Sequence, residues 1–265
     1  MELHPYIQAE MHSEYIFGIY DKFVDEKGMV GGKKEFKDTH NKQIYDFVKI
    51  GDNLFIGHPK NACMTINVEN KEAMIMWFGH IKNCAHWRNA KHMFLWGLVV
   101  LLREFPKIKK ISLGDDTKIK CKKSIHRLAK YYFLRYGAMY YELYFDFKIY
   151  FQLKQDKKQY EEAIYKRRKT KITKIWVKDF LLEINENPPI FIDVFGNNLE
   201  MPIEEYLSCF KQDLRKEYCD IFYLLTSSFF NSFISISLPS TFYINIDKKS
   251  KFVKYLKEKI NKIIT

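Results

Sequence analysis

The sequence predicts an α+β protein, with a mixed sheet flanked by helices and a mainly helical C-terminal extension. Short runs rich in Ile, Phe, Met and Val come first. A strand–helix–strand succession follows, an order that usually gives a parallel pair of strands. Charged segments with a helical period fill much of the rest. The 265 residues, 47% of them hydrophobic, suffice for one large domain or for one domain with an appendage.

The first predicted elements are three short strands. Asn53–Gly57, Cys63–Val68 and Ala73–Ile81 are rich in apolar residues and are separated by turn residues. The spacing predicts an antiparallel meander. Upstream of it, Gly28–Lys33 predicts a turn or a loop, because three of its six residues are glycine.

The period then changes to that of a helix over Trp87–Phe105, which stops at Pro106. Lys107–Leu113 predicts the next strand. Ala73–Ile81 and Lys107–Leu113 should therefore be neighbouring parallel strands joined by this helix.

Two further elements are expected before residue 156. The first is a helix over Lys122–Tyr136. The second is Tyr140–Phe151, which is either an aromatic strand or a helix end followed by a strand. We expect residues 1–156 to form one domain and residues 157–265 to form a helical extension packed on it.

The extension should contain helices over Gln159–Lys171, Ile203–Tyr218 and Ser250–Ile264, the last of them amphipathic. Between these, Ile221–Ile246 has no charged side chain. Its serines and asparagines make it a poor membrane span. A buried helix followed by a buried strand over Ser240–Asp247 explains it better.

The net charge and the cysteine content of the chain indicate its partners and its cellular compartment. The formal net charge of +12 favours anionic partners such as nucleic acid, acidic membranes or phosphorylated cofactors. Five cysteines form no Cys-x-x-Cys pair, and the first residues do not resemble a secretory leader. We therefore expect reduced cysteines and a cytoplasmic location, with the nucleus as the alternative.

Two local clusters bear on partners. The run Lys166–Lys171 is a candidate nucleic-acid or nuclear-targeting patch. The alternative is a solvated helix face paired with nearby glutamates. His80, Cys84, His86 and His92 are residue types that bind zinc, but their spacing matches no zinc motif. No metal is therefore predicted.

Two segments carry a family resemblance. Lys110–Lys118 reads KISLGDDTK, and a second segment reads YFLRYGAMYYELY, in which the matching spacings fall on Tyr132, Leu134, Gly137, Tyr140 and Tyr141. With the strand order, these segments resemble GNAT-type acetyltransferase-like proteins of large eukaryotic DNA viruses. Phe145-Asp146 stands where that family has Gly-Phe. The resemblance implies a viral protein located in the host cytoplasm or a viral factory.

The resemblance implies that acetyl-CoA is the cofactor. The pyrophosphate would lie at the N-terminus of the helix after the central strand, where amides and the helix dipole favour anions. Arg88, Asn89, Ala90 and Lys91 match that place, and Lys122 is the candidate for the adenosine 3′-phosphate. The loop before the helix has no glycine, which keeps the backbone further from a phosphate.

The resemblance also implies the catalytic residues. Tyr141 matches the tyrosine that protonates the departing thiolate, and Tyr132 is a second candidate. His80, Asp115 and Asp116 are the candidates for a general base. The alternative for the tyrosines is packing, and for the two aspartates it is a turn after a strand.

Three functions follow from these observations. The first is an acyl-CoA-dependent N-acetyltransferase acting on an amine. The second is a catalytically inactive GNAT-like structural or binding protein, which the glycine-free loop favours. The third is a basic nucleic-acid-binding protein whose aromatic side chains stack on bases.

Overall fold

The computed structural model describes residues 34–38, 43–57, 62–79, 90–246 and 250–264. Its contacts divide the chain into two compact units. Unit 1 comprises residues 1–115, 145–148 and 241–265, and unit 2 comprises residues 116–144 and 149–240. The division expected after residue 156 falls inside unit 2. As a statement about independently folding domains, it stays a prediction.

Unit 1 is built on a mixed sheet with the strand order β1-β2-β3-β4-β5-β6-β12-β9. The strands are β1 (Lys34–Asp38), β2 (Gln43–Ile50), β3 (Asn53–Ile56), β4 (Met64–Glu69), β5 (Glu72–Phe78), β6 (Lys110–Gly114), β9 (Lys148–Ile149) and β12 (Thr241–Asn245). β1 to β5 form an antiparallel series, which confirms the predicted meander and adds two strands before it.

β5 and β6 are parallel neighbours, with Glu72 opposite Lys110 and Ile75 opposite Leu113. The helix between them, α2, spans Ala90–Glu104. This confirms the predicted strand–helix–strand unit. β12 then pairs antiparallel with the other edge of β6, so a late segment completes a sheet begun early in the chain.

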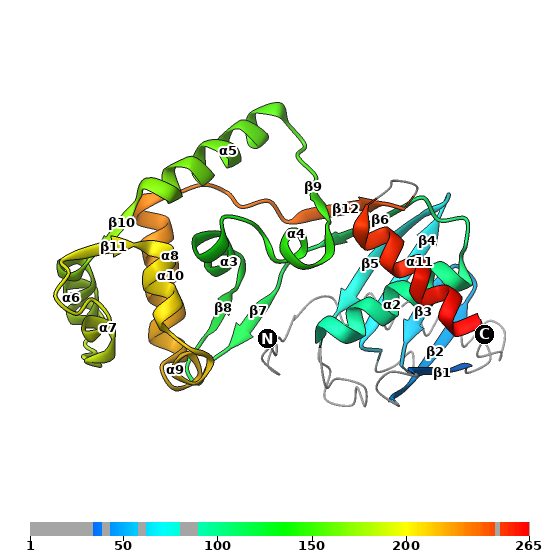
Figure 1. Cartoon of the computed structure of the whole chain (residues 1–265), viewed down its shortest axis with the longest axis horizontal. Helices are drawn as coiled ribbons and strands as arrows, with labels where there is room; N and C mark the ends of the chain where they lie inside the picture. The colour runs from blue at the N-terminus through cyan, green and yellow to red at the C-terminus, as the bar shows by residue number, and fades with distance from the viewer. Residues whose placement is uncertain (1–33, 39–42, 58–61, 80–89, 247–249, 265) are drawn as a thin grey trace. The chain divides into compact units, whose positions relative to one another are not determined.

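Two helices cover one face of this sheet, α2 and α11 (Lys251–Ile264) (Figure 1). Nearly every described side chain of α2 from Met93 to Leu102 is buried, because one side packs on the sheet and another on α11. The approach to the sheet is close: a Cβ on Gly97 would lie 2.2 Å from the sulfur of Met64. A larger residue at position 97 would therefore require the flexible Met64 side chain to move.

Unit 2 is mostly helical, with two small two-stranded sheets (Figure 1). Its helices are α3 (Ala129–Tyr136), α4 (Tyr140–Phe145), α5 (Lys154–Lys169), α6 (Lys174–Glu183), α7 (Ile190–Asp193), α8 (Ile203–Cys209), α9 (Gln212–Glu217) and α10 (Cys219–Phe233). The small sheets pair β7 (Lys118–Lys120) with β8 (Ile125–Arg127), and β10 (Lys171–Thr173) with β11 (Glu200–Pro202). The core is aromatic, with Tyr206, Phe222 and Phe229 fully buried.

The structure corrects two helix predictions. The helix expected over Lys122–Tyr136 begins only at Ala129, because residues before it form the β7–β8 hairpin. The helix expected over Ile203–Tyr218 is broken into α8 and α9 at Phe210, whose backbone is extended and whose ring is buried. Periodicity alone missed both breaks, since each depends on contacts with distant segments.

The other helical predictions are confirmed in outline. Tyr140–Phe151 is a helix followed by a short strand, the second of the two alternatives. The uncharged segment forms α10 and then β12, with buried Phe222, Phe229 and Phe242. Among the described residues, we find no helix long and apolar enough to cross a membrane.

Candidate functional site

The first candidate site is the place where β5 extends beyond the end of β6. Their pairing ends at Ile75 and Leu113, whereas β5 continues to Phe78. The register with β4 shifts at the same place: Ile66 faces Ile75 but Thr65 faces Trp77, so Met76 is an extra residue in a β-bulge. We call Met76–Phe78 the divergent segment of β5.

The divergent segment lies next to two unsatisfied polar atoms. Thr65 Oγ1 and Trp77 Nε1 are buried and have no hydrogen-bond partner among the described residues. Since buried polar atoms are nearly always paired, such atoms indicate a place where a further polar group belongs.

A helix N-terminus follows the divergent segment in the chain. α2 begins at Ala90, as predicted for the pyrophosphate site, and has no acidic residue in its first turn. The first amides of a helix have no partner within it, and acidic neighbours would compete with a phosphate for them. Lys91 also belongs to this turn. Arg88, Asn89 and His80, together with Cys84 and His86, lie outside the described residues.

The predicted tyrosines lie in unit 2 and are buried. Tyr141 is in the first turn of α4, with 6% of its surface exposed. Tyr132, on α3, stacks on Tyr136 with ring centroids 5.9 Å apart and makes a tilted contact with Tyr140 at 5.1 Å. Burial, reinforced by neighbouring tyrosines, raises the pKa of Tyr132 well above its usual range. Tyr132 therefore keeps its proton at neutral pH, and its contacts support a packing role.

Lys122 is not at a helix start, where it was expected to meet a phosphate. It lies in the exposed turn of the β7–β8 hairpin. Its backbone amide and that of Lys123 donate hydrogen bonds to the carboxylate of Asp220. An acidic side chain therefore occupies the place at these amides that the prediction gave to an anion.

Asp116 is held by charge pairs near this hairpin. Its carboxylate lies 2.8 Å from Lys118 Nζ and 3.2 Å from Arg127 Nε. These contacts engage the carboxylate in ion pairs, which supports the turn interpretation over the general-base interpretation.

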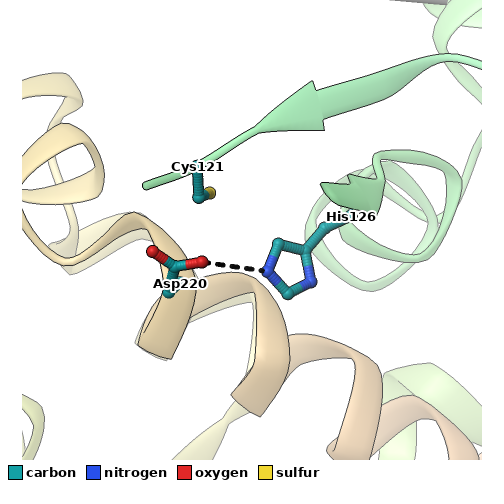
Figure 2. Close-up of side chains that lie close together, drawn as sticks. All are labelled: Cys121, His126 and Asp220. Carbon is teal, nitrogen blue, oxygen red and sulfur yellow. Dashed lines mark ion pairs between the residues drawn. The ribbon is translucent and has the colours of Figure 1, made fainter. Parts of the chain in front are cut away.

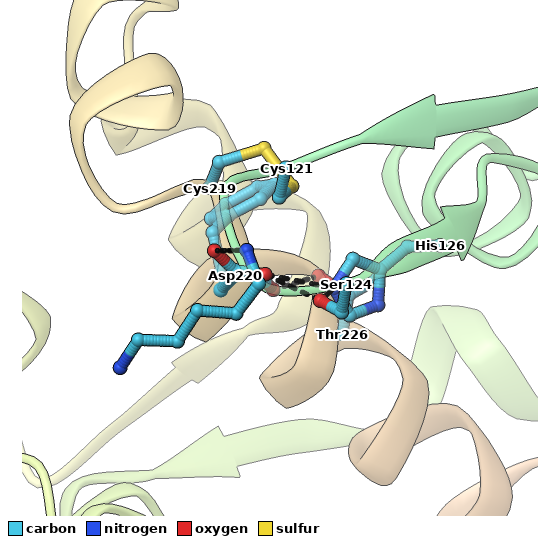
Figure 3. The surroundings of a disulfide bond; sticks show 8 residues. Cys121, Ser124, His126, Cys219, Asp220 and Thr226 are labelled. Atoms are coloured by element: carbon cyan, nitrogen blue, oxygen red, sulfur yellow. Dashed lines mark hydrogen bonds and ion pairs between the residues drawn. A yellow bond between two sulfur atoms is a disulfide. The ribbon is translucent and has the colours of Figure 1, made fainter. Parts of the chain in front are cut away.

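Asp220 belongs to a second candidate site, which sequence reasoning missed. Cys121, Ser124 and His126 of the hairpin meet Cys219 and Asp220 at the start of α10 (Figures 2 and 3). We call these five residues the hairpin cluster. The two segments are nearly 100 residues apart, so no short sequence motif contains all five residues. The sequence does show metal-binding residue types at both places: Cys121 and His126 in one segment, and Cys219 next to Asp220 in the other.

Cys121 and Cys219 form a disulfide, with Cα atoms 5.5 Å apart (Figure 3). Cys63 is also disulfide-bonded. The expectation of reduced cysteines is therefore wrong for these residues. Sequence spacing could not show it, because the fold brings the partners together across 98 residues. Cys209, by contrast, is a free and exposed thiol.

The polar contacts of the hairpin cluster are short. Ser124 Oγ lies 2.5 Å from His126 Nε2 and donates to Asp220 Oδ1. Asp220 Oδ1 lies 3.8 Å from the same histidine nitrogen. Ser124 and Asp220 thus both lie next to Nε2 of the His126 ring. A nucleophilic triad needs them on opposite nitrogens, so this arrangement does not activate Ser124.

Burial and charge set the protonation of these groups. Burial lowers the pKa of His126, although Asp220 opposes the shift. For Asp220, burial alone would raise the pKa, but Ser124, the Lys123 amide and His126 together hold it below the usual value. The site therefore holds a carboxylate beside a neutral imidazole at neutral pH.

A comparison of the chain with models of known protein families, with curated proteins and with solved structures found no match.

Proposed function

We propose that unit 1 is an acyl-CoA-dependent N-acetyltransferase-like domain that transfers an acetyl group to an amine. The observation that carries the proposal is the divergent segment of β5. The pairing of β5 with β6 ends at Ile75, and β6 itself ends at Gly114, so the backbone of Met76–Phe78 is unpaired with β6. Such a backbone can exchange hydrogen bonds with the amides of a pantetheine arm.

The position of α2 supports the same cofactor. A helix that starts soon after the divergent segment offers its amides and its dipole to a pyrophosphate. Lys91 adds a positive charge in the first turn, and the resemblance adds Arg88 and Asn89. In this proposal the backbone of Ala90 binds the anion, while the lysine attracts it from solution.

The chemistry divides between cofactor and chain. Acetyl-CoA, when bound, supplies the activated acetyl group as a thioester. The chain must orient that group and handle two protons. The resemblance assigns donation of a proton to Tyr141 Oη, which belongs to unit 2, and leaves His80, Asp115 and Asp116 as candidates for removing one from the amine.

A second candidate is a GNAT-like protein that has lost catalysis. The specific observation in its favour is the burial of Tyr132 among other tyrosines, which suits packing. The glycine-free loop before Ala90 favours it too. Binding of acetyl-CoA separates the first function from an inactive scaffold that no longer binds the cofactor.

Isothermal titration of the full chain with acetyl-CoA tests the proposal. We expect binding, and we expect Lys91→Ala to weaken it about 10-fold, the scale of one lost charge-assisted contact. Lys107→Ala is the matched control, since Lys107 is an exposed lysine just after the other end of α2. It should leave the affinity unchanged. Absence of binding at millimolar acetyl-CoA, or equal effects of both variants, would contradict the proposal.

A further inference from the structure

The hairpin cluster places more metal-binding side chains together than a structural disulfide needs. One ligand atom each from Cys121, His126 and Asp220 lies within 4.8 Å of the others (Figure 2). The Cys219 sulfur is bonded to that of Cys121. Reduction of this bond would therefore leave two thiols, one imidazole and one carboxylate around a common point.

We propose that the reduced hairpin cluster binds a zinc ion through Cys121, Cys219, His126 and Asp220. Four ligands of this kind complete the tetrahedral shell that Zn²⁺ takes in structural sites. Bonds of about 2.3 Å to sulfur and about 2.0 Å to nitrogen or oxygen put such atoms about 3.3–3.8 Å apart. The observed separations are close enough for side-chain rotations to reach this geometry.

The ligands are already oriented by neighbouring groups. The Lys123 amide donates to Asp220 Oδ2 at 3.0 Å, which leaves Oδ1 facing His126. The imidazole stacks on the ring of Tyr223, with centroids 6.0 Å apart. Contacts of this kind fix ligands in metal sites and tune their affinity. In the metal-bound state, the ion would replace the Ser124 hydroxyl as the bridge between His126 and Asp220.

Burial and access also suit a metal. The His126 side chain is 9% exposed and that of Asp220 is 23% exposed, so few waters compete for the ion. Asp220 also lines a pocket of about 440 Å³ together with Lys122 and Lys123, which gives an entry path. Two thiolates and one carboxylate exceed the charge of Zn²⁺ by one unit. The exposed Lys122 can offset that excess, whereas Lys123 Nζ is already paired with Glu186.

The disulfide and the metal site exclude each other, so redox conditions choose between them. A dithiol reductant supplies two electrons and two protons to the Cys121–Cys219 bond and becomes a disulfide itself. Zn²⁺ then binds the two sulfurs as thiolates, and two protons go to solvent. An oxidant of the thiol–disulfide class reverses both steps and releases the ion.

Cobalt spectroscopy on the full-length chain tests this proposal. After reduction with a phosphine, one equivalent of Co²⁺ should give the visible bands of tetrahedral cobalt and a thiolate charge-transfer band. Zn²⁺ should displace the cobalt. The oxidised protein should give neither band. Loss of a ligand in His126→Ala or Asp220→Asn should weaken Co²⁺ binding by more than about 10-fold, since even loss of an outer-shell partner costs that much.

Cys209→Ser is the matched control and should bind Co²⁺ as the wild type does, because its thiol is outside the cluster. Circular dichroism of the reduced chain shows whether it stays folded. If it does not, added Zn²⁺ should restore the helical signal. The proposal is wrong if the reduced wild type binds no Co²⁺ and gains no structure with Zn²⁺. It is equally wrong if the bands survive in both ligand variants or vanish in Cys209→Ser.

Discussion

Individual residues in unit 2 show why composition alone misleads about function. Arg167 stands in the basic run Lys166–Lys171, yet it is only 6% exposed. Lys171 pairs with Glu200 across the β10–β11 sheet. Lys166, Arg168 and Lys169 remain exposed. A charge run in a sequence therefore mixes buried structural cations with solvated ones, and the nucleic-acid partner stays a prediction.

Glu142 is a residue whose protonation should affect stability. Its Oε2 accepts hydrogen bonds from the Met139 amide at 2.9 Å and from Tyr160 Oη at 3.1 Å. Burial raises the pKa of Glu142, and these two hydrogen bonds only partly oppose the shift. A raised pKa in the folded state means that the native protein binds this proton more tightly than the unfolded chain does. Its contribution to stability is therefore complete below the unfolded pKa and is lost as pH rises through the folded pKa.

We expect Glu142→Gln to remove this dependence, because the amide is neutral at every pH and its oxygen still accepts a hydrogen bond. The melting temperature of the variant should match the wild type near about pH 4, exceed it increasingly as pH rises to the folded pKa of Glu142, and exceed it by a constant amount above that pKa. Thermal melts of both proteins across this range measure the difference. A difference that stays constant across the whole range, or that shrinks with rising pH, would show that burial does not control this carboxyl group.

At the scale of elements, the best-predicted parts are those in which local pattern and tertiary environment agree. Ala73–Ile81 was predicted as a strand because apolar residues recur there, and the structure uses Glu72–Phe78. Pro106 correctly predicted the end of α2. The parallel pairing of β5 with β6 was predicted from the strand–helix–strand order alone.

The β7–β8 hairpin could not be predicted in the same way. Its turn is held by a backbone bond from the Cys121 amide to the Ser124 carbonyl and by Asp220, which comes almost 100 residues later. The hairpin cluster depends on the same long-range contact. No property of residues 118–127 alone reveals it, which is why a helix was predicted there.

The C-terminal end of α3 is capped by Gly137, whose amide donates to the Phe133 carbonyl, and by a side chain from α5. Arg167 Nε donates to the Leu134 carbonyl at 2.7 Å and Nη2 donates to the Arg135 carbonyl at 3.1 Å. Nη2 also lies 2.6 Å from Glu204 Oε2. The last carbonyls of a helix have no partner within it, so this guanidinium supplies the missing donors.

Arg167→Ala should therefore destabilise the protein by about 2–4 kcal/mol, because it leaves buried carbonyls unsatisfied and removes a buried stem. Arg167→Lys should restore only part of the lost stability, since one ammonium group cannot donate to all the acceptors that the planar guanidinium reaches. Arg168→Ala is the control: its exposed side chain should change stability by less than about 0.5 kcal/mol. Urea unfolding measures all three, and equal effects at positions 167 and 168 would refute the capping role.

At the scale of the whole molecule, the chain is two compact units interleaved in sequence rather than two consecutive domains. Unit 1 includes residues 145–148 and 241–265, which come later in the chain than the first residues of unit 2. Sequence order suggested a first domain followed by an extension, because periodicity does not show that a late strand such as β12 joins an early sheet. The cytoplasmic location rested on reduced cysteines, and with a disulfide present it stays a prediction.

The central claim is that unit 1 binds an acyl-CoA, and thermal unfolding with and without acetyl-CoA tests it most directly. A ligand that binds only the native state stabilises it, by about 2.7 kcal/mol at 100 times its dissociation constant. We predict that the melting temperature rises with acetyl-CoA concentration and rises less in Lys91→Ala. An unchanged melting temperature at millimolar acetyl-CoA would contradict the account.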